Sequence, residues 1–147
     1  MKLPEYVSKS EVQQVCEELG LRDWTQLKEP KVLTHEAELL QKLVGGEAQM
    51  ISVEAFQQGL EVELEHGIQF SDANVTNNHP ILTGMIVLAH LKEMLDYYAR
   101  LQVAELEGDL LKAIRAGNIE KARIKYRRLV EAQAALAYLT KSGFDEN

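Results

Sequence analysis

Cysteine, proline and tryptophan are scarce in this 147-residue chain, which contains one Cys, three Pro and one Trp. The single thiol, Cys16, cannot form an internal disulfide, and its apolar neighbours predict a buried structural thiol rather than a reactive one. No apolar run approaches the roughly 18 residues that a membrane span needs. The N-terminus has no apolar signal-peptide core. We therefore expect a cytoplasmic protein with no membrane partner.

Positive charge is also in deficit, because the formal net charge is −7. Net negative charge disfavours binding to the phosphate backbone of nucleic acid, so we expect no nucleic-acid partner. The one basic cluster, at positions 121–128, has no aromatic platform beside it and is typical of a solvated helix face. With 46% hydrophobic residues, the chain is long enough for one compact domain with a real core.

The sparse prolines and the abundance of Ala, Leu, Glu, Lys and Arg predict an all-α protein. We expect a helical bundle in which a long central helix packs antiparallel to the 52–67 helix. The long helix should run from about 80 through 107, bend at 108–109 and continue to 116. A single domain over 1–147 would then comprise an N-terminal helical extension (1–50), a motif-bearing core (52–107) and a C-terminal helix (118–141).

Small polar residues mark the expected helix starts. Ser10 should cap a short helix ending before Gly20, and Thr34 should cap another over 35–44. The polar segment 67–79 should form an ordered loop that reverses the chain, and Asn77 or Asn78 should cap the next helix ahead of Pro80.

The most informative motif is a pair of mirrored spacings. Glu63 and His66 are three residues apart, and so are His90 and Glu93. On two neighbouring helices these spacings would direct two carboxylates and two imidazoles to one place. Such ligands suit iron, zinc or manganese, so the four residues are candidate ligands of a divalent metal ion.

Helical periodicity strengthens this interpretation. At about 100° per residue, Glu63 and His66 fall among the apolar side chains of their helix, whereas Glu54, Glu61 and Glu65 fall on the opposite face. His90 likewise shares an apolar face, and Glu93 lies at its edge. Polar groups on apolar faces need partners, because an unpaired buried ion costs several kcal/mol. In an antiparallel pair, His66 should meet His90 while Glu63 meets Glu93.

Two interpretations of these residues stay open. The first is a metal centre, in which Asp96, Tyr97 and Tyr98 would orient the histidines from outside the ligand set. The second is a protein-only hydrogen-bond network that fixes the register of the helices. Catalysis, for example on oxygen or peroxide, would in addition need an open coordination position and access for a substrate.

The same segments carry a resemblance. The block from Glu61 to Gly67 and the block Ala89-His90-Leu91-x-Glu93-x-x-Asp96-Tyr97-Tyr98 are similar to an uncharacterised domain family of bacteria and bacteriophages, over about residues 52–107. Its phage-like members carry acidic residues at the positions of His79 and Ala89. The resemblance brings no established activity with it. It favours, as the alternative to metal binding, a non-catalytic structural or interaction subunit of a larger assembly, of which a phage-related assembly is one example.

The oligomeric state is the last expectation. Helices of uneven length leave more apolar surface than a chain of this size easily covers, so we expect a homo-oligomer that uses the long helix or the last one. A protein partner is the other way to cover such a surface.

Overall fold

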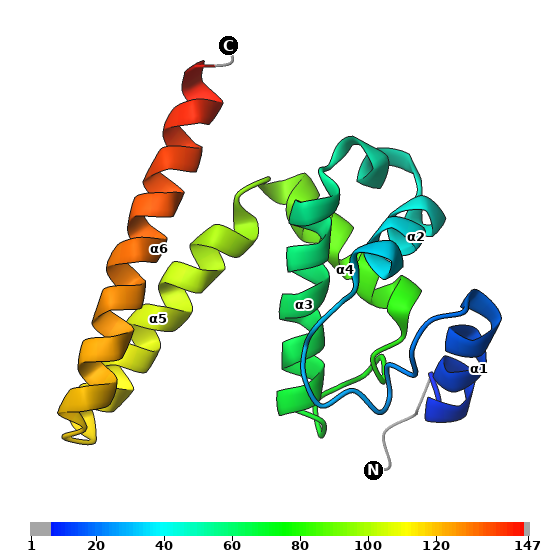
Figure 1. The fold of residues 1–147 in the computed structure, drawn as a ribbon, viewed down its shortest axis with the longest axis horizontal. Coiled ribbons are helices and arrows are strands. Elements are labelled where there is room, and N and C mark those ends of the chain that lie inside the picture. Colours follow the sequence, from blue (N-terminus) through cyan, green and yellow to red (C-terminus); the bar gives the residue numbers. More distant parts are fainter. Residues whose placement is uncertain (1–6, 146–147) are drawn as a thin grey trace. The chain divides into compact units, whose positions relative to one another are not determined.

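The chain is all-α over the part that the structure describes. The structure is a computed structural model that describes residues 7–145, with side chains described for residues 7–142. The elements are α1 (Lys9–Leu19), α2 (Thr34–Val44), the 3-10 helix η1 (Gly46–Met50), α3 (Val53–Gln69), α4 (Pro80–Glu93), α5 (Tyr97–Arg115) and α6 (Ile119–Asp145) (Figure 1). Within these residues, none of the helices is long and apolar enough to cross a bilayer. The predicted all-α helical bundle is confirmed.

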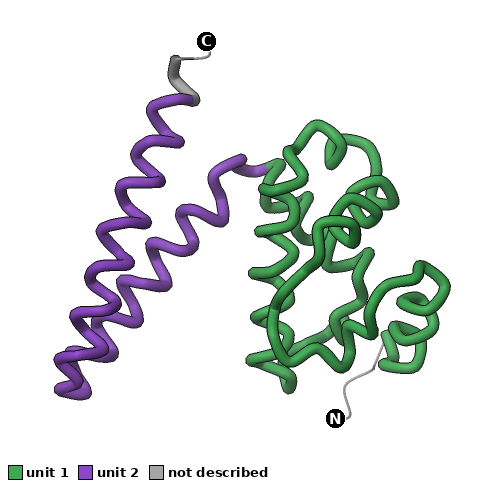
Figure 2. The backbone as a smooth tube through the Cα atoms, viewed as in Figure 1, with its two compact units in different colours: residues 1–92 green, residues 93–147 purple. Residues whose placement is uncertain are grey.

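The chain divides into two compact units, residues 1–92 and residues 93–147 (Figure 2). The first unit holds α1 to α4, and the second holds α5 and α6. The single-domain organisation expected from the sequence stays a prediction, because two compact units can still unfold in one cooperative step.

The first unit has a closed apolar core. Its fully buried side chains come from every helix and from the 21–33 connection, where Trp24 has no exposed surface. Cys16 is buried in the same core, and burial raises the pKa of its thiol, so the prediction of a structural thiol holds. The core side chains are Val12, Cys16, Trp24, Val32, Ala37, Leu40, Ala48, Phe56, Leu60, Leu64, Val87 and Leu91.

Helices α3 and α4 run in opposite directions because the 70–79 loop returns the chain (Figure 1). Gly84 makes their close approach feasible. A Cβ at Gly84 would lie 2.9 Å from Val44 of α2 and 3.3 Å from Phe56 of α3. The predicted antiparallel packing of the 52–67 helix against the helix beginning at Pro80 is therefore observed.

Several helix ends differ from the sequence prediction. Ser8, rather than Ser10, caps α1 by accepting the Glu11 amide, and α1 ends at Gly20 with a φ of 66° as expected. Thr34 is the first residue of α2 and not its cap. Asn77 and Asn78 both have positive φ, and the Leu82 amide is directed instead to Nδ1 of His79, at 3.4 Å. A side-chain acceptor suffices for capping, so a histidine could take the place expected for asparagine.

The long central helix is interrupted. It ends at Glu93, and α5 begins at Tyr97 after a short turn closed by the Tyr97 amide on the Met94 carbonyl. The expected bend at Gly108 is absent, since α5 is continuous through that position. No proline or glycine lies between Gly84 and Gly108, so the sequence contains no breaker at the real interruption. The longest helix is α6.

The second unit is an antiparallel helical hairpin. Gly117, with a φ of 66°, and Asn118, whose side chain accepts the Lys121 amide, form the turn between α5 and α6. Leu106, Leu129 and Ala132 make its small buried cluster. Lys125 Nζ lies 2.5 Å from Asp109 Oδ2, which pairs the two helices at that level. This hydrogen bond holds the pKa of the Asp109 carboxyl below its ordinary value.

Candidate functional site

One pair among the predicted site residues joins two helices. Nδ1 of His90, on α4, lies 3.0 Å from Oε1 of Glu63, on α3. Their side chains are 30% and 15% exposed, so water screens the pair only in part. Because an ionised carboxylate only accepts hydrogen bonds, Nδ1 of His90 must carry the proton in this contact. Nε2 is then the ring atom of His90 that could bind a metal ion or form a second hydrogen bond.

This pairing differs from the predicted register. The expected partners were His66 with His90 and Glu63 with Glu93, whereas the structure pairs Glu63 with His90. The crossing of α3 and α4 therefore places the residues about one helical turn from the predicted alignment. His66 lies one turn after Glu63, and its ring is 6.5 Å from the ring of Phe70.

The remaining predicted residues lie in the second unit. Glu93 is exposed, and it is the first residue of that unit. Asp96 accepts two hydrogen bonds from Arg100, at 2.9 and 2.6 Å, and these hold the pKa of its carboxyl below the ordinary value. Tyr98 is buried, and its ring meets that of Tyr97 edge-on at 5.2 Å. The expected part of Asp96, Tyr97 and Tyr98 in orienting the histidines stays a prediction.

No cluster of three or more His, Cys, Asp or Glu side chains within residues 7–142 is arranged to hold a metal ion. A metal site normally needs three or four protein ligands at about 2.0–2.2 Å. The metal centre built from Glu63, His66, His90 and Glu93 accordingly stays a prediction, and iron, zinc and manganese stay its candidate ions.

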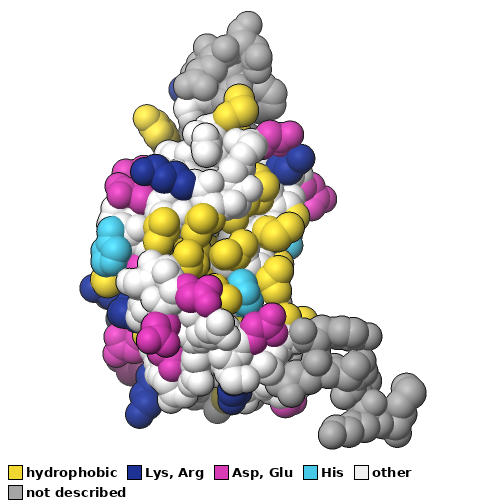
Figure 3. All heavy atoms as spheres, turned by 90° about the vertical axis from the view of Figure 1, so that its right-hand side faces the viewer, with side chains coloured by type: hydrophobic (Ala, Val, Ile, Leu, Met, Phe, Trp, Pro, Cys, Tyr) yellow, Lys and Arg dark blue, Asp and Glu magenta, His cyan; other side chains and the backbone are white. Residues whose placement is uncertain are grey.

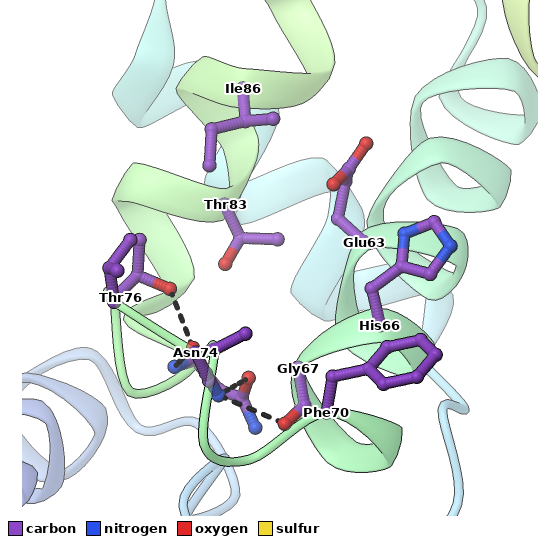
Figure 4. A pocket seen from close by; sticks show the side chains of 11 residues that line it. Glu63, His66, Gly67, Phe70, Asn74, Thr76, Thr83 and Ile86 are labelled. Atoms are coloured by element: carbon purple, nitrogen blue, oxygen red, sulfur yellow. Dashed lines mark hydrogen bonds between the residues drawn. The ribbon is translucent and has the colours of Figure 1, made fainter.

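A hollow of about 270 Å³ lies beside Glu63 and His66 (Figure 4). Thr83 and Ile86 of α4 face it across from α3, and the loop after α3 closes one end through Asn74. Most of the lining is apolar, with Glu63 as its only carboxylate. The hollow is a shallow surface feature with one acidic group rather than a set of converging catalytic groups.

Asparagines hold the loop that closes this hollow. Asn74 donates to the Gly67 carbonyl and to the side chain of Asn78, at 3.1 and 2.7 Å. Asn78 is buried and donates to the carbonyl of Trp24. Gly67 has no room for a side chain, because a Cβ there would lie 2.0 Å from Oδ1 of Asn78. The ordered loop expected from the sequence is present, and side-chain hydrogen bonds give it its shape.

Sequence reasoning missed the strongest ionic contact of the first unit. The Glu36 carboxylate is fully buried and accepts hydrogen bonds from Nε and Nη2 of Arg22, at 3.0 and 2.5 Å. The amide of Leu33 also donates to it, at 3.0 Å. Burial raises the pKa of the Glu36 carboxyl, but the Arg22 and backbone hydrogen bonds lower it more, so it lies below its ordinary value.

The signal for this contact was present at the start of α2. Glu36 is the third residue of that helix, where a glutamate commonly returns to the amide of the capping position. Glu61 also differs from expectation, because it is half-buried and accepts the Val32 amide at 3.1 Å instead of facing solvent. Both carboxylates fasten the 21–33 connection to the helices, which is a structural role.

A second hollow, of about 240 Å³, lies between α2 and α4. Its lining is apolar apart from Lys92, and two of its members, Leu43 and Met85, are 45% and 55% exposed. Figure 3 shows hydrophobic side chains gathered near the middle of one face of the first unit, with charged groups around them. Such a surface is typical of contact with another protein rather than of chemistry.

Comparison with known proteins identifies a family for this chain. Residues 12–107 match DUF5661, a family of proteins of unknown function. This chain belongs to that family. The matched segment begins within α1 and ends within α5, so the family includes most of the N-terminal extension for which the sequence suggested no counterpart. No curated protein and no solved structure matches this DUF5661 protein.

Proposed function

We propose that this DUF5661 protein is a non-catalytic interaction protein whose α5–α6 hairpin presents an apolar face to another protein. The supporting observation is the number of large apolar side chains that the hairpin exposes. They are Leu111, Ile114, Ile119, Tyr126 and Val130, each between 46% and 68% exposed. Monomeric proteins seldom leave an apolar surface of this extent uncovered.

The Glu63–His90 contact takes a structural part in this proposal. It joins α3 to α4 next to the apolar contacts around Gly84 and fixes the register of the two helices. A polar pair of this kind selects one packing arrangement among several apolar ones. A loss of this pair would then reduce the stability of the first unit rather than abolish a reaction.

A photo-crosslinking amino acid at Ile114 tests this proposal. The same amino acid at Ile124, which is similarly exposed on the other side of the hairpin, is the matched control. We expect protein adducts in cells from position 114 and few or none from position 124. Equal yields from the two positions, or no adduct from either, would contradict an interaction surface on this face.

A metal ion is the second candidate function, and the Glu63–His90 contact is the observation that favours it. A carboxylate on Nδ1 is the usual way in which a protein orients a metal-binding imidazole. Iron, zinc or manganese would then bind Nε2 of His90, with His66 and Glu93 completing the ligand set after a local rearrangement. Glu63 would serve as the orienting carboxylate or as a direct ligand.

Elemental analysis of the protein purified without added metal decides this second candidate. We expect a stoichiometric ion in the parent, and its loss together with a lower melting temperature in His66→Ala and His90→Ala. If the parent binds no metal and His90→Ala still lowers the melting temperature, the metal candidate is wrong. The Glu63–His90 contact then serves only to fix the register of the helices.

A further inference from the structure

Most of the exposed apolar residues of the hairpin project to one flank of it. Leu129 and Ala132 mark the side of α6 that is buried against α5. At about 100° per residue, Ile119, Tyr126 and Val130 all project within 100° of Leu129 on one flank of that buried side. Ile124 projects to the far side of the helix. One flank of α6 therefore has three partly exposed apolar side chains, with Arg123 on the same flank.

Helix α5 has the matching flank. Relative to the buried Leu106, Ile114 and Leu111 project to the flank that corresponds to Ile119 and Val130 on α6. Two antiparallel helices that face each other turn equivalent flanks to the same side. The apolar residues of α5 and α6 thus lie on one side of the hairpin, together with Glu107 of α5. We call this side the hairpin face and define its apolar members as Leu111, Ile114, Ile119, Tyr126 and Val130.

Charges at the rim of the hairpin face suit a second copy. The Asp109–Lys125 hydrogen bond places these two residues at the same height along the hairpin axis. Glu107 precedes Asp109 by two residues and Arg127 follows Lys125 by two, so in antiparallel helices Glu107 and Arg127 also lie at the same height. Glu107 projects from the same flank of α5 as Ile114, whereas Arg127 projects toward the outer side of α6. A two-fold axis parallel to the helices would lay α5 of one copy on α6 of the other, and would bring Glu107 of each copy to Arg127 of its partner.

The balance of charge points the same way. Residues 93–147 contain nine acidic and nine basic side chains, whereas residues 1–92 contain 14 acidic and seven basic ones. Two hairpins can therefore approach without net repulsion, unlike two copies of the first unit. Four antiparallel helices around a shared apolar core also form a stable architecture, which a two-helix hairpin does not.

We infer that the partner of the hairpin face is a second copy of this chain, and that the two hairpins form an antiparallel four-helix bundle. This inference rests on the proposed interaction function and names its partner. Contact is isologous, because the same five apolar residues and the same Glu107 and Arg127 serve both copies. The Glu107–Arg127 pairs select this register over other apolar alignments.

Mass measurement by light scattering and sedimentation equilibrium, on the full chain over a range of micromolar concentrations, tests the inference. We expect the parent to have twice the chain mass, with Ile114→Glu and Val130→Glu reduced to monomers that keep the parent's helical circular dichroism. Ile124→Glu, the control on the far side of α6, should stay dimeric. A monomeric parent, or face variants with unchanged mass, would overturn the inference.

Charge reversal gives a second readout that does not depend on the apolar variants. Glu107→Arg alone and Arg127→Glu alone should each weaken the dimer at least tenfold, and the two changes together should restore it. Failure of the double variant to recover would overturn the proposed register. A parent that is monomeric but still forms adducts with a different protein from position 114 would overturn the inference and leave the interaction function intact.

Discussion

The two units of this chain bury their apolar residues to different extents. The first unit encloses a core drawn from four helices and a connection, with Trp24, Phe56 and Leu60 completely buried. The second unit has two long helices, yet its main buried cluster consists of Leu106, Leu129 and Ala132, each 8% exposed. A core enclosed by four helices can stand alone, whereas two helices in contact leave half of each apolar stripe uncovered.

The two units also differ in how far their polar contacts are buried. The first unit uses buried or half-buried carboxylates and asparagines, such as Glu36, Glu61 and Asn78, to hold its connections. In the described part of the second unit the ion pairs along the helices are mainly exposed, and Asp109–Lys125 is partly buried. Buried polar contacts fix one structure, while exposed pairs contribute little to stability. The first unit is therefore the part whose structure is specified from within.

Removal of Arg22 should give the largest effect. Arg22→Met leaves the fully buried Glu36 carboxylate without its cation, and breaking such a pair costs about 3 kcal/mol or more in the free energy of unfolding. Chemical denaturation of the two proteins measures this difference. Arg100→Met, which removes the exposed partner of Asp96, is the matched control and should change stability little. Equal effects of the two changes would contradict the distinction between the units.

Core truncation should also separate the units. Leu60→Ala removes a completely buried side chain of the first unit and should cost about 3 kcal/mol, independent of protein concentration. Leu129→Ala, in the shallower hairpin core, should cost roughly 2 kcal/mol. If the hairpin is shared between copies, the cost at Leu129 should also vary with protein concentration. Thermal unfolding at two concentrations checks both values, and identical behaviour would count against the comparison.

Alanine substitutions at two helical glycines should change the stability of the protein in opposite directions. Gly67→Ala must displace Asn78 and the loop that it holds, and overpacking of this kind costs roughly 2 kcal/mol. Gly108→Ala meets nothing within 4 Å and should stabilise α5 by about 0.5–1 kcal/mol. Denaturation midpoints measure the two changes. Stabilisation by Gly67→Ala would show that the loop is not held as described.

The pH dependence of the Arg22–Glu36 contact should give the smallest effect. The folded-state pKa of Glu36 lies below its ordinary value, so the contact stabilises the protein above the ordinary Glu pKa of about 4.3. That contribution disappears as the pH falls through the lowered folded-state pKa. The stability difference between the parent and Arg22→Met should therefore shrink between about pH 6 and pH 3. A difference that is constant over this range would contradict the assignment.

Periodicity predicted much of the fold. The apolar spacings of the 52–67 and 80–93 segments predicted two antiparallel helices, and Gly20 and Gly117 marked a helix end and a turn because their positive φ values suit glycine. The interruption at 94–96 could not be predicted, since Met94, Leu95 and Asp96 continue a plausible helix. The caps were misplaced by two residues or fewer because several polar residues competed for each helix start.

The candidate site was predicted in part. The placement of Glu63 and His90 on apolar faces predicted a contact between α3 and α4, and the 3.0 Å hydrogen bond is that contact. The register was missed because crossed helices do not align residues by sequence separation alone. The Arg22–Glu36 contact was missed because Arg22 lies in an irregular connection, where periodicity gives no information about neighbours.

The central claim is that the first unit is complete and that the hairpin is completed by another molecule. Hydrogen exchange measured by mass spectrometry at several protein concentrations tests it most directly. We predict that amide protection in α5 and α6 rises with protein concentration, while protection in α1 to α4 stays constant. Protection in the hairpin that equals that of the first unit and does not change with concentration would contradict the account.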